Sequence, residues 1–258
     1  MLTHPEKTVA RQSGHEATQT GCIDALEVAR NPSRFDAKAQ RTAKEHINRY
    51  CFAKSFIKNK KIIDASCGTG YGSEIFNEAG FSQYIGIDID EGALSIAEGQ
   101  HGAQPHTSFI KGDLAHMEMG SLGNSFDVFI SFETVEHFPQ YDHFLSFINS
   151  CLAPQGMLII STPNRDVTNP GTTFSAKPVW EHHTQEWTLE EFTQLLQQHH
   201  FTIQHVYGQS FRFKHLFGRR FYGSRWLKKI TQWPLPLKWL MCVAEPNFFV
   251  FVCTRDDV

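Results

Sequence analysis

The chain has 258 residues, of which 41% are hydrophobic, an ordinary share for a globular protein with a sizeable core. The formal net charge is −3, so no overall basic charge favours nucleic acid as a partner. No stretch approaches the roughly 18 apolar residues of a membrane-spanning helix. The six cysteines form no C-x-x-C pair of the kind found in zinc and redox sites. Together with the polar N-terminal residues, these features predict a cytoplasmic protein.

The first half of the chain predicts an arm followed by alternating strands and helices. Residues 1 to about 35 are polar and lack a sustained period, and we expect residues 1–45 to form an N-terminal arm or lid. Residues 36–58 have apolar positions typical of a helix. Beyond them, short apolar strands are expected near 61–63, 84–89, 109–113, 126–132 and 157–160, with helices beginning near 71, 93 and 141.

The second half predicts one more helix and two last strands. The capping-box pattern Thr188–Glu191 opens a helix, and strands are expected at 203–207 and 248–253. Strands that alternate with helices predict an α/β fold, a mostly parallel doubly wound sheet with helices on both faces. Right-handed crossovers place the loops after the strands on one edge, where ligands bind. We treat residues 46–258 as one domain with an insertion at about 208–246.

The strongest motif is I-I-D-A-S-C-G-T-G-Y-G, from Ile62 to Gly72, in which a strand runs into a small-residue turn and then a helix. Gly68 and Gly70 let the backbone approach a ligand closely. Such a turn serves dinucleotides, phosphates or other adenosine ligands, and some turns of this kind bind nothing. The dinucleotide fingerprint has a third glycine where this chain has Ser73. A nicotinamide-dependent oxidoreductase is therefore an alternative that this motif disfavours.

Acidic residues end the next two expected strands. Asp88 stands where an acid accepts hydrogen bonds from both hydroxyls of a ribose. Asp113 ends the third strand, where a carboxylate can accept a hydrogen bond from an exocyclic amine. A single acid at a strand end is commonly a solvated loop residue, but three at successive strand ends, beginning with Asp64, favour an adenosine ligand.

This series, followed by S-F-D-V-F-I-S-F-E-T-V-E-H from Ser125 to His137 and by the L-A-P-Q-G turn that ends at Gly156, resembles the class I S-adenosylmethionine-dependent methyltransferases. The resemblance covers roughly residues 46–207. It implies a Rossmann-like fold, S-adenosylmethionine as cofactor and methyltransferase activity. One departure is Ser66, where the family usually has glycine.

The resemblance also implies roles at the cofactor site. Asp64 would face the amino group of the cofactor, directly or through water. Asp88 would hold the ribose, and Asp113 the adenine amine, with apolar neighbours flanking the ring. The backbone after the fourth strand would lie close to the sulfonium. The implied cofactor-binding residues are Asp64, Ser66, Gly68, Gly70, Asp88, Ile89, Asp113, Leu114, Ser131 and Phe132.

Candidates for the transfer step lie in two loops at the same edge. A hydroxyl acceptor must lose its proton to a general base or near a metal ion. On a helical turn after the fourth strand, Glu133, Glu136 and His137 would share one face. Their Glu-x-x-Glu-His pattern resembles that of ubiquinone-pathway O-methyltransferases and small-RNA 2′-O-methyltransferases, in which it can hold a divalent metal. By the pattern of the RNA enzymes His183, four residues before Trp187, would be the fourth ligand.

Three interpretations of these residues stay open. In the first, His137 or His183 acts as a base, and Glu136 also belongs to the catalytic set. In the second, a metal ion is bound by Glu133, Glu136, His137 and His183. In the third, these residues have only a structural role. We favour the histidine base slightly, because the four-residue metal pattern is a partial match.

The acceptor is less sharply indicated. The segments 45–50 and 161–164, with the histidine-rich loop, resemble more loosely the bacterial methyltransferases of surface-polysaccharide synthesis, which implies a glycan or glycolipid hydroxyl beside a small-molecule hydroxyl. The insertion at 208–246 mixes aromatic and basic residues without a clean apolar face, which favours a substrate cap over peripheral membrane contact. A protein that binds S-adenosylmethionine without catalysis is a further alternative, and the oligomeric state is not indicated.

Overall fold

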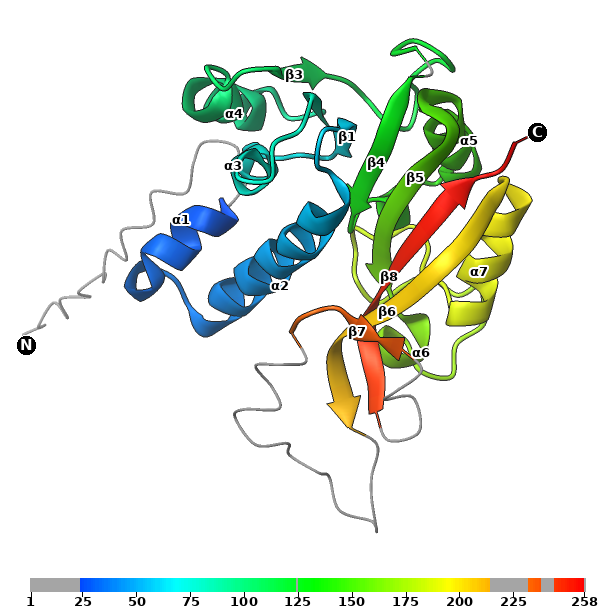
Figure 1. Ribbon diagram of the computed structural model, residues 1–258. Coiled ribbons are helices and arrows are strands. Elements are labelled where there is room, and N and C mark those ends of the chain that lie inside the picture. The colour runs from blue at the N-terminus through cyan, green and yellow to red at the C-terminus, as the bar shows by residue number, and fades with distance from the viewer. Residues whose placement is uncertain (1–23, 124, 214–231, 238–243, 258) are drawn as a thin grey trace, which may run out of the picture.

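The computed structural model describes residues 24–123, 125–213, 232–237 and 244–257, which form one eight-stranded sheet with helices on both faces (Figure 1). The described helices are α1 (Ala25–Arg30), α2 (Ala37–Ala53), α3 (Tyr71–Asn77), α4 (Glu91–His101), α5 (Tyr141–Cys151), α6 (Arg165–Thr168) and α7 (Leu189–Gln198). The strands are β1 (Lys61–Ala65), β2 (Gln83–Asp88), β3 (Thr107–Lys111), β4 (Phe126–Phe132), β5 (Leu152–Pro163), β6 (Phe201–Phe213), β7 (Leu235–Pro236) and β8 (Ala244–Arg255).

The strand order is β3-β2-β1-β4-β5-β8-β6-β7, and the first five strands in sequence run parallel. The chain moves outward from β1 to β3 and then returns to place β4 beside β1, so the order reverses between these two strands. In doubly wound sheets, ligands bind outside the carboxyl ends of the strands at such a reversal. The predicted α/β fold is confirmed, and its topology puts the loops after β1 and β4 side by side.

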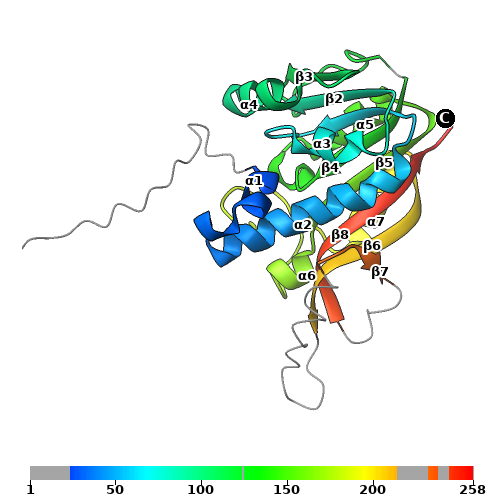
Figure 2. The ribbon, with the colours of Figure 1, turned by 60° about the vertical axis from the view of Figure 1, so that its left-hand side comes forward.

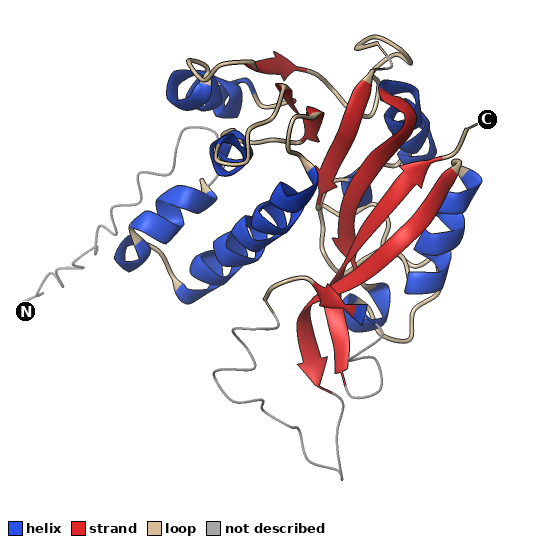
Figure 3. Cartoon of the chain, in the orientation of Figure 1, coloured by secondary structure: helices blue, strands red, loops and turns tan. Residues whose placement is uncertain are grey.

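The two faces of the sheet have separate hydrophobic cores. One core contains Phe144 of α5 and Phe192 of α7, and the other contains Tyr50 of α2 and Phe76 of α3. The helices therefore lie in two layers, with α2 running along one face of the sheet (Figures 2 and 3). This double-sided burial fixes the strands, so that the loops at their carboxyl ends start from rigid supports.

The N-terminal segment begins, in the described residues, with a helix held against the glycine-rich turn. Ala25 and Val28 of α1 are buried. Asp24 caps α1 by accepting a hydrogen bond from the Glu27 N–H (2.8 Å) and also accepts one from Thr69 Oγ1 (2.7 Å). The boundary expected between residues 45 and 46 falls inside α2, which continues without interruption. Residues 1–23, the rest of the expected arm or lid, lie outside the described residues.

The last two strands are longer than the sequence predicts. β6 and β8 pair antiparallel from Phe201 opposite Arg255 to Phe213 opposite Ala244, so both ends of the expected insertion belong to the sheet. Within the insertion, Gln232 accepts a hydrogen bond from Asn48 of α2 (3.1 Å). Residues 214–231 and 238–243 lie outside the described residues, and a substrate cap or a membrane contact there stays a prediction. Among the helices that the structure describes, none is long and apolar enough to cross a membrane.

Candidate active site

The turn after β1 has an unusual backbone. Ser66, Gly68 and Gly70 all have a positive φ, at 56°, 55° and 75°. At Gly70 a Cβ would come within 2.7 Å of the Phe109 ring, so a larger residue does not fit. Ser66 occupies the left-handed region in which glycine has no steric cost, which explains why glycine suits this position. The Ser66 side chain is exposed, so the departure from the family pattern strains the backbone without creating a clash.

Asp88 fastens this turn to the end of β2. Its Oδ2 accepts a hydrogen bond from the Gly68 N–H (2.8 Å), and its Oδ1 accepts one from the Asp90 N–H (2.9 Å). The neighbouring Ile89 is 62% exposed, so its apolar side chain is open to contact with a ligand. A carboxylate with spare lone pairs and an uncovered apolar side chain match the two ends of an adenosine, its ribose and its ring. The residues present therefore fit the adenosine part of the expected cofactor.

The other expected adenosine-site residues lie at the ends of β3 and β4. Asp113 is exposed and bonds His116 Nδ1 (2.8 Å), while Leu114 is buried in the core. Ser131 and Phe132 are buried at the end of β4, and Ser131 lies beside Ala65 in the sheet. Ser131 Oγ has no hydrogen-bond partner among the described residues. A buried hydroxyl without a partner costs free energy, so this atom suits contact with a bound polar group.

Asp64 lies beneath the turn, fully buried between two tyrosines. Its carboxylate accepts hydrogen bonds from the Tyr50 hydroxyl (3.0 and 3.1 Å) and from the Tyr84 hydroxyl (2.5 Å). Burial raises the pKa of Asp64 to about 7, against the opposing effect of the two tyrosine hydrogen bonds. The structure thus places Asp64 under the turn as expected and gives its carboxyl two protein partners.

The loop after β4 differs from the predicted helical turn. Glu133 has a φ of 51°, and only Val135–His137 form a short 3₁₀ helix. The expected helical turn therefore does not include Glu133, which lies outside the group formed by Glu136, His137 and His183. Glu133 Oε1 accepts a hydrogen bond from Ser161 Oγ (2.7 Å) and lies 3.8 Å from Arg49 Nη1.

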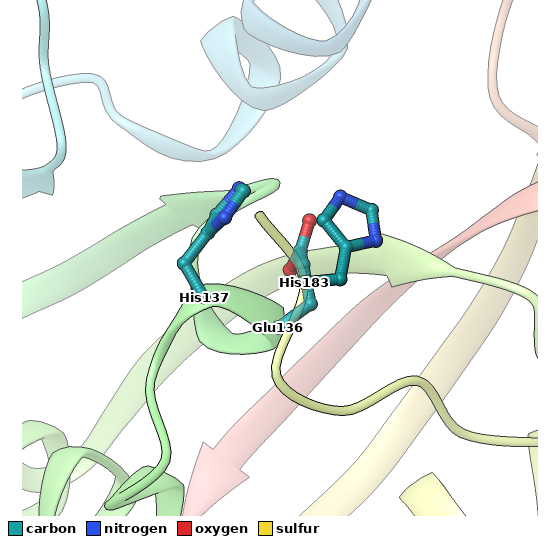
Figure 4. A group of neighbouring side chains, drawn as sticks. All are labelled: Glu136, His137 and His183. Atoms are coloured by element: carbon teal, nitrogen blue, oxygen red, sulfur yellow. The ribbon is translucent and has the colours of Figure 1, made fainter. Parts of the chain in front are cut away.

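Glu136, His137 and His183 do converge. One potential ligand atom from each lies within 4.8 Å of the others, and the three side chains stand together at the end of β4 (Figure 4). Glu136 is fully buried, and neither of its carboxylate oxygens has a hydrogen-bond partner among the described residues. Burial, followed by repulsion from Glu133, holds the pKa of Glu136 well above its ordinary value. A carboxyl in this setting is protonated or is neutralised by a cation.

The two histidines each have one nitrogen engaged. His137 Nδ1 lies 2.9 Å from the carbonyl oxygen of His182, and His183 Nδ1 lies 2.6 Å from Glu186 Oε1. Because a carbonyl and a carboxylate oxygen accept hydrogen bonds, Nδ1 of each ring is assigned as the donor, which leaves Nε2 of each ring for other contacts. Desolvation lowers the pKa of His137, so this ring is neutral at neutral pH. A neutral imidazole with a free lone pair can accept a proton or bind a metal ion.

Backbone contacts hold the two loops together. Thr184 N–H donates to the Glu136 carbonyl (2.7 Å), and Trp187 is buried against Tyr141 and Phe192. Trp187 also forms a β-bridge with Asn164, just beyond β5. The buried tryptophan therefore anchors the loop that carries His183.

Comparison with known proteins assigns the chain to a family. A family model described as a methyltransferase domain matches residues 35–206, well over half of the chain. The chain belongs to the class I S-adenosylmethionine-dependent methyltransferase family. S-Adenosylmethionine is the methyl donor of this family, in agreement with the geometry of the candidate adenosine site, and membership favours a methyltransferase over the dinucleotide oxidoreductase alternative.

Relatives of this methyltransferase include proteins with and without a named pathway. A "Probable S-adenosylmethionine-dependent methyltransferase" of Mycolicibacterium smegmatis is 29% identical over 149 residues, 58% of this chain and 54% of that protein. A ubiquinone biosynthesis O-methyltransferase of Bartonella tribocorum is 27% identical over 135 residues, 52% of this chain and 53% of that protein. The chain thus spans about half the length of these curated relatives. A crystal structure of an S-adenosylmethionine-dependent methyltransferase from Mesorhizobium loti shares the fold, with a TM-score of 0.55 and 17% identity over 77% of this chain and 92% of that one.

Two charged residues of the methyltransferase site are not predicted from the sequence. Arg49 of α2 is 1% exposed, donates to Gln209 Oε1 (2.7 Å) and faces Glu133. Glu186 is fully buried beside His183. The sequence signal for Arg49 is a charged residue among the apolar positions of a helix. The signal for Glu186 is an acid three residues after a histidine. Only the fold, however, brings these two groups to the site.

Proposed function

We propose that this methyltransferase transfers the methyl group of S-adenosylmethionine to a hydroxyl group of a small molecule or of a glycan or glycolipid. The observation that carries the proposal is the convergence of Glu136, His137 and His183 at the end of β4. β4 pairs with β1 up to Ala65 opposite Ser131, so this cluster borders the adenosine-site turn. Groups that can take a proton therefore stand next to the expected methyl donor.

The chemistry is an in-line displacement. The acceptor oxygen attacks the methyl carbon, the carbon–sulfur bond breaks with its electron pair moving to sulfur, and the hydroxyl proton leaves to a base. Correct alignment can supply roughly 7–11 kcal/mol of the barrier reduction. A neutral histidine of the pair His137 and His183 accepts the proton through Nε2, and the buried Glu136 carboxyl lies beside it.

A divalent cation at the same residues is a second candidate mechanism, supported by the two unpaired oxygens of Glu136. Glu136, His137 and His183 would hold the ion, and a different rotamer of Glu133 would bring in the fourth expected ligand. A bound ion supplies Lewis acidity that lowers the pKa of the acceptor hydroxyl. A ligand set of one carboxylate and two imidazoles favours Mn²⁺, Co²⁺ or Zn²⁺ over Mg²⁺.

The surface near the cluster supports an acceptor with an apolar or ring-shaped part. Phe174, Val179 and Trp180 are exposed on the loop that leads to His183. The Trp180 ring lies 6.3 Å from the His183 ring at an angle of 27°. An exposed aromatic plane beside the proton acceptor suits a phenol or a sugar ring. The ubiquinone-pathway relative, whose name specifies O-methylation, supports oxygen as the methylated atom.

The test is incubation with methyl-labelled S-adenosylmethionine and extract of the source organism, followed by identification of the labelled species. We expect a labelled methyl ether. Labelled nitrogen, carbon or sulfur would refute the hydroxyl acceptor, and failure to bind the cofactor in calorimetry would refute the methyltransferase assignment. Turnover after exhaustive chelation, and after adding back Mn²⁺, Co²⁺ or Zn²⁺, separates the two mechanisms.

A further inference from the structure

Glu186 is a buried carboxylate that the reaction scheme above does not use. It is fully buried, and its two oxygens face different groups. Oε1 meets His183 Nδ1 at 2.6 Å, whereas Oε2 accepts hydrogen bonds from Thr168 Oγ1 and from Asn169 Nδ2. Thr168 is the last residue of α6 and Asn169 follows it, so the end of this short helix beyond β5 supplies hydrogen-bond partners for the carboxylate.

Asn169 Nδ2 can only donate a hydrogen bond, whereas the single hydroxyl hydrogen of Thr168 has two acceptors nearby, Glu186 Oε2 and the Asn164 carbonyl oxygen (3.0 Å). Hydrogen bonds from donors stabilise the carboxylate form of a buried glutamate. The donors Asn169 Nδ2 and His183 Nδ1 therefore favour the carboxylate form of Glu186, which has no proton to donate to the imidazole. The ring of His183 must supply the proton of their shared hydrogen bond from Nδ1.

The two histidines of the cluster differ in this respect. Nδ1 of His137 donates to a backbone carbonyl, which is neutral, whereas Nδ1 of His183 donates to a full negative charge. A carboxylate fixes the tautomer and orientation of an imidazole and makes its other nitrogen a better base. His183 is also held by its loop, because the neighbouring Thr184 is bound to the Glu136 carbonyl.

We propose that Glu186 is a positioning residue that holds His183 in the Nδ1–H tautomer and thereby selects His183, and not His137, as the group that accepts the acceptor's proton. The proposal rests on the proposed function for the transfer step, but the tautomer itself does not. Glu186 would act through His183 without touching the acceptor or the cofactor.

The variant Glu186→Gln tests this with little change in shape. Its amide NH₂ must face either His183 or the pair Thr168 and Asn169. Thr168 Oγ1 could accept from the new NH₂, but the Asn169 NH₂ cannot, and the Val179 N–H (2.8 Å) holds Asn169 Oδ1 in place. The glutamine oxygen therefore suits the side of Asn169, and the NH₂ is expected to turn toward His183. His183 Nδ1 then becomes an acceptor, and the ring proton moves to Nε2, where it blocks proton uptake.

The experiment is nitrogen NMR of the whole protein with ¹⁵N-labelled histidine rings at pH 8.5, with the His183 signals assigned by their loss in His183→Asn. We expect the Nδ1–H tautomer in the unmodified protein and the Nε2–H tautomer in Glu186→Gln. The matched control is Glu191→Gln, which loses a nearby carboxylate that bonds Arg165 (2.6 Å) and does not contact His183. The control should keep the original tautomer.

Kinetics complete the test. With methyl-labelled S-adenosylmethionine and the acceptor fraction that it labels, kcat of Glu186→Gln should fall about 10–100-fold. Its affinity for S-adenosylhomocysteine in calorimetry should stay within about twofold, because no adenosine-site residue is changed. An Nε2–H tautomer in the unmodified protein, or an unchanged tautomer in Glu186→Gln, overturns the proposal. If the tautomers are as predicted but the unmodified protein transfers no methyl group, the proposed function is refuted, whereas the assignment of Glu186 as the residue that positions His183 is retained.

Discussion

Replacing Asp64 by asparagine should remove a large part of the pH dependence of stability. The carboxyl of Asp64 is fully buried, and its pKa is about 7 in the folded protein against 3.8 for the free group. The folded state therefore holds this proton more tightly than the unfolded state does. The contribution of Asp64 to the free energy of unfolding is therefore most favourable below pH 4. It is lost as the pH rises through 7, because unfolding then releases the proton to solvent. Asparagine has the same shape and no proton to lose.

The magnitude follows from the difference between the two pKa values. One pKa unit corresponds to about 1.36 kcal/mol. Between pH 5 and pH 8 the Asp64 penalty grows by about 2–3 kcal/mol, since part of it is already present at pH 5. Any loss from poorer hydrogen bonding of the amide to Tyr50 and Tyr84 is nearly independent of pH, and it cancels when the two pH values are compared.

The assay is urea unfolding of the unmodified protein and Asp64→Asn at pH 5 and pH 8. The free energy of unfolding of the variant, relative to the unmodified protein, should rise by about 2–3 kcal/mol between the two pH values. The control is Asp166→Asn, which changes an exposed carboxylate and should show no such rise. A relative stability of Asp64→Asn that is the same at both pH values would refute the argument that Asp64 holds its proton near neutrality.

Three further predictions concern the turn and the transfer step. Asp88→Ala should weaken S-adenosylhomocysteine binding in calorimetry by about 1.5–3 kcal/mol, the scale of hydrogen bonds to a charged group, whereas Asp90→Asn, which keeps an N-cap acceptor for α4, should bind normally. Ser66→Gly should raise the free energy of unfolding in urea by about 0.5–1 kcal/mol, because glycine adopts a positive φ without steric strain. The control Ser82→Gly, at an exposed position, should lower the free energy of unfolding, and a loss of stability in Ser66→Gly would contradict the strain at Ser66. With a histidine base, His183→Ala should reduce methyl transfer about 10²–10⁴-fold and chelators should leave the unmodified enzyme active; loss of activity on chelation with recovery on Mn²⁺ would instead establish the metal.

The sequence by itself determined the fold class and the glycine-rich turn at which we expect the adenosine to bind. Local signals carry that information: the alternating strands and helices, the small residues at 66–70, and acids at the ends of successive strands. β4 has the predicted bounds, and the capping box at Thr188 forms as predicted. These features depend on residues within a few positions of one another. A turn whose φ values are near +60° favours glycine, so the glycines in the sequence indicate the turn directly.

The tertiary structure decided how the candidate residues for the transfer step are arranged. The pattern Glu-x-x-Glu-His suggested one helical face, but Glu133 has a positive φ, and its carboxylate lies 3.8 Å from Arg49, a residue of α2 that is far away in the sequence. His183 and its partner Glu186 reach Glu136 because β4 and β5 are neighbours and a buried tryptophan anchors the second loop. The protonation of Glu136 and Asp64 depends in turn on burial by many distant residues. Spacing along the chain does not encode such desolvation, because it is a property of the surrounding volume and exists only after the sheet and its helices have assembled.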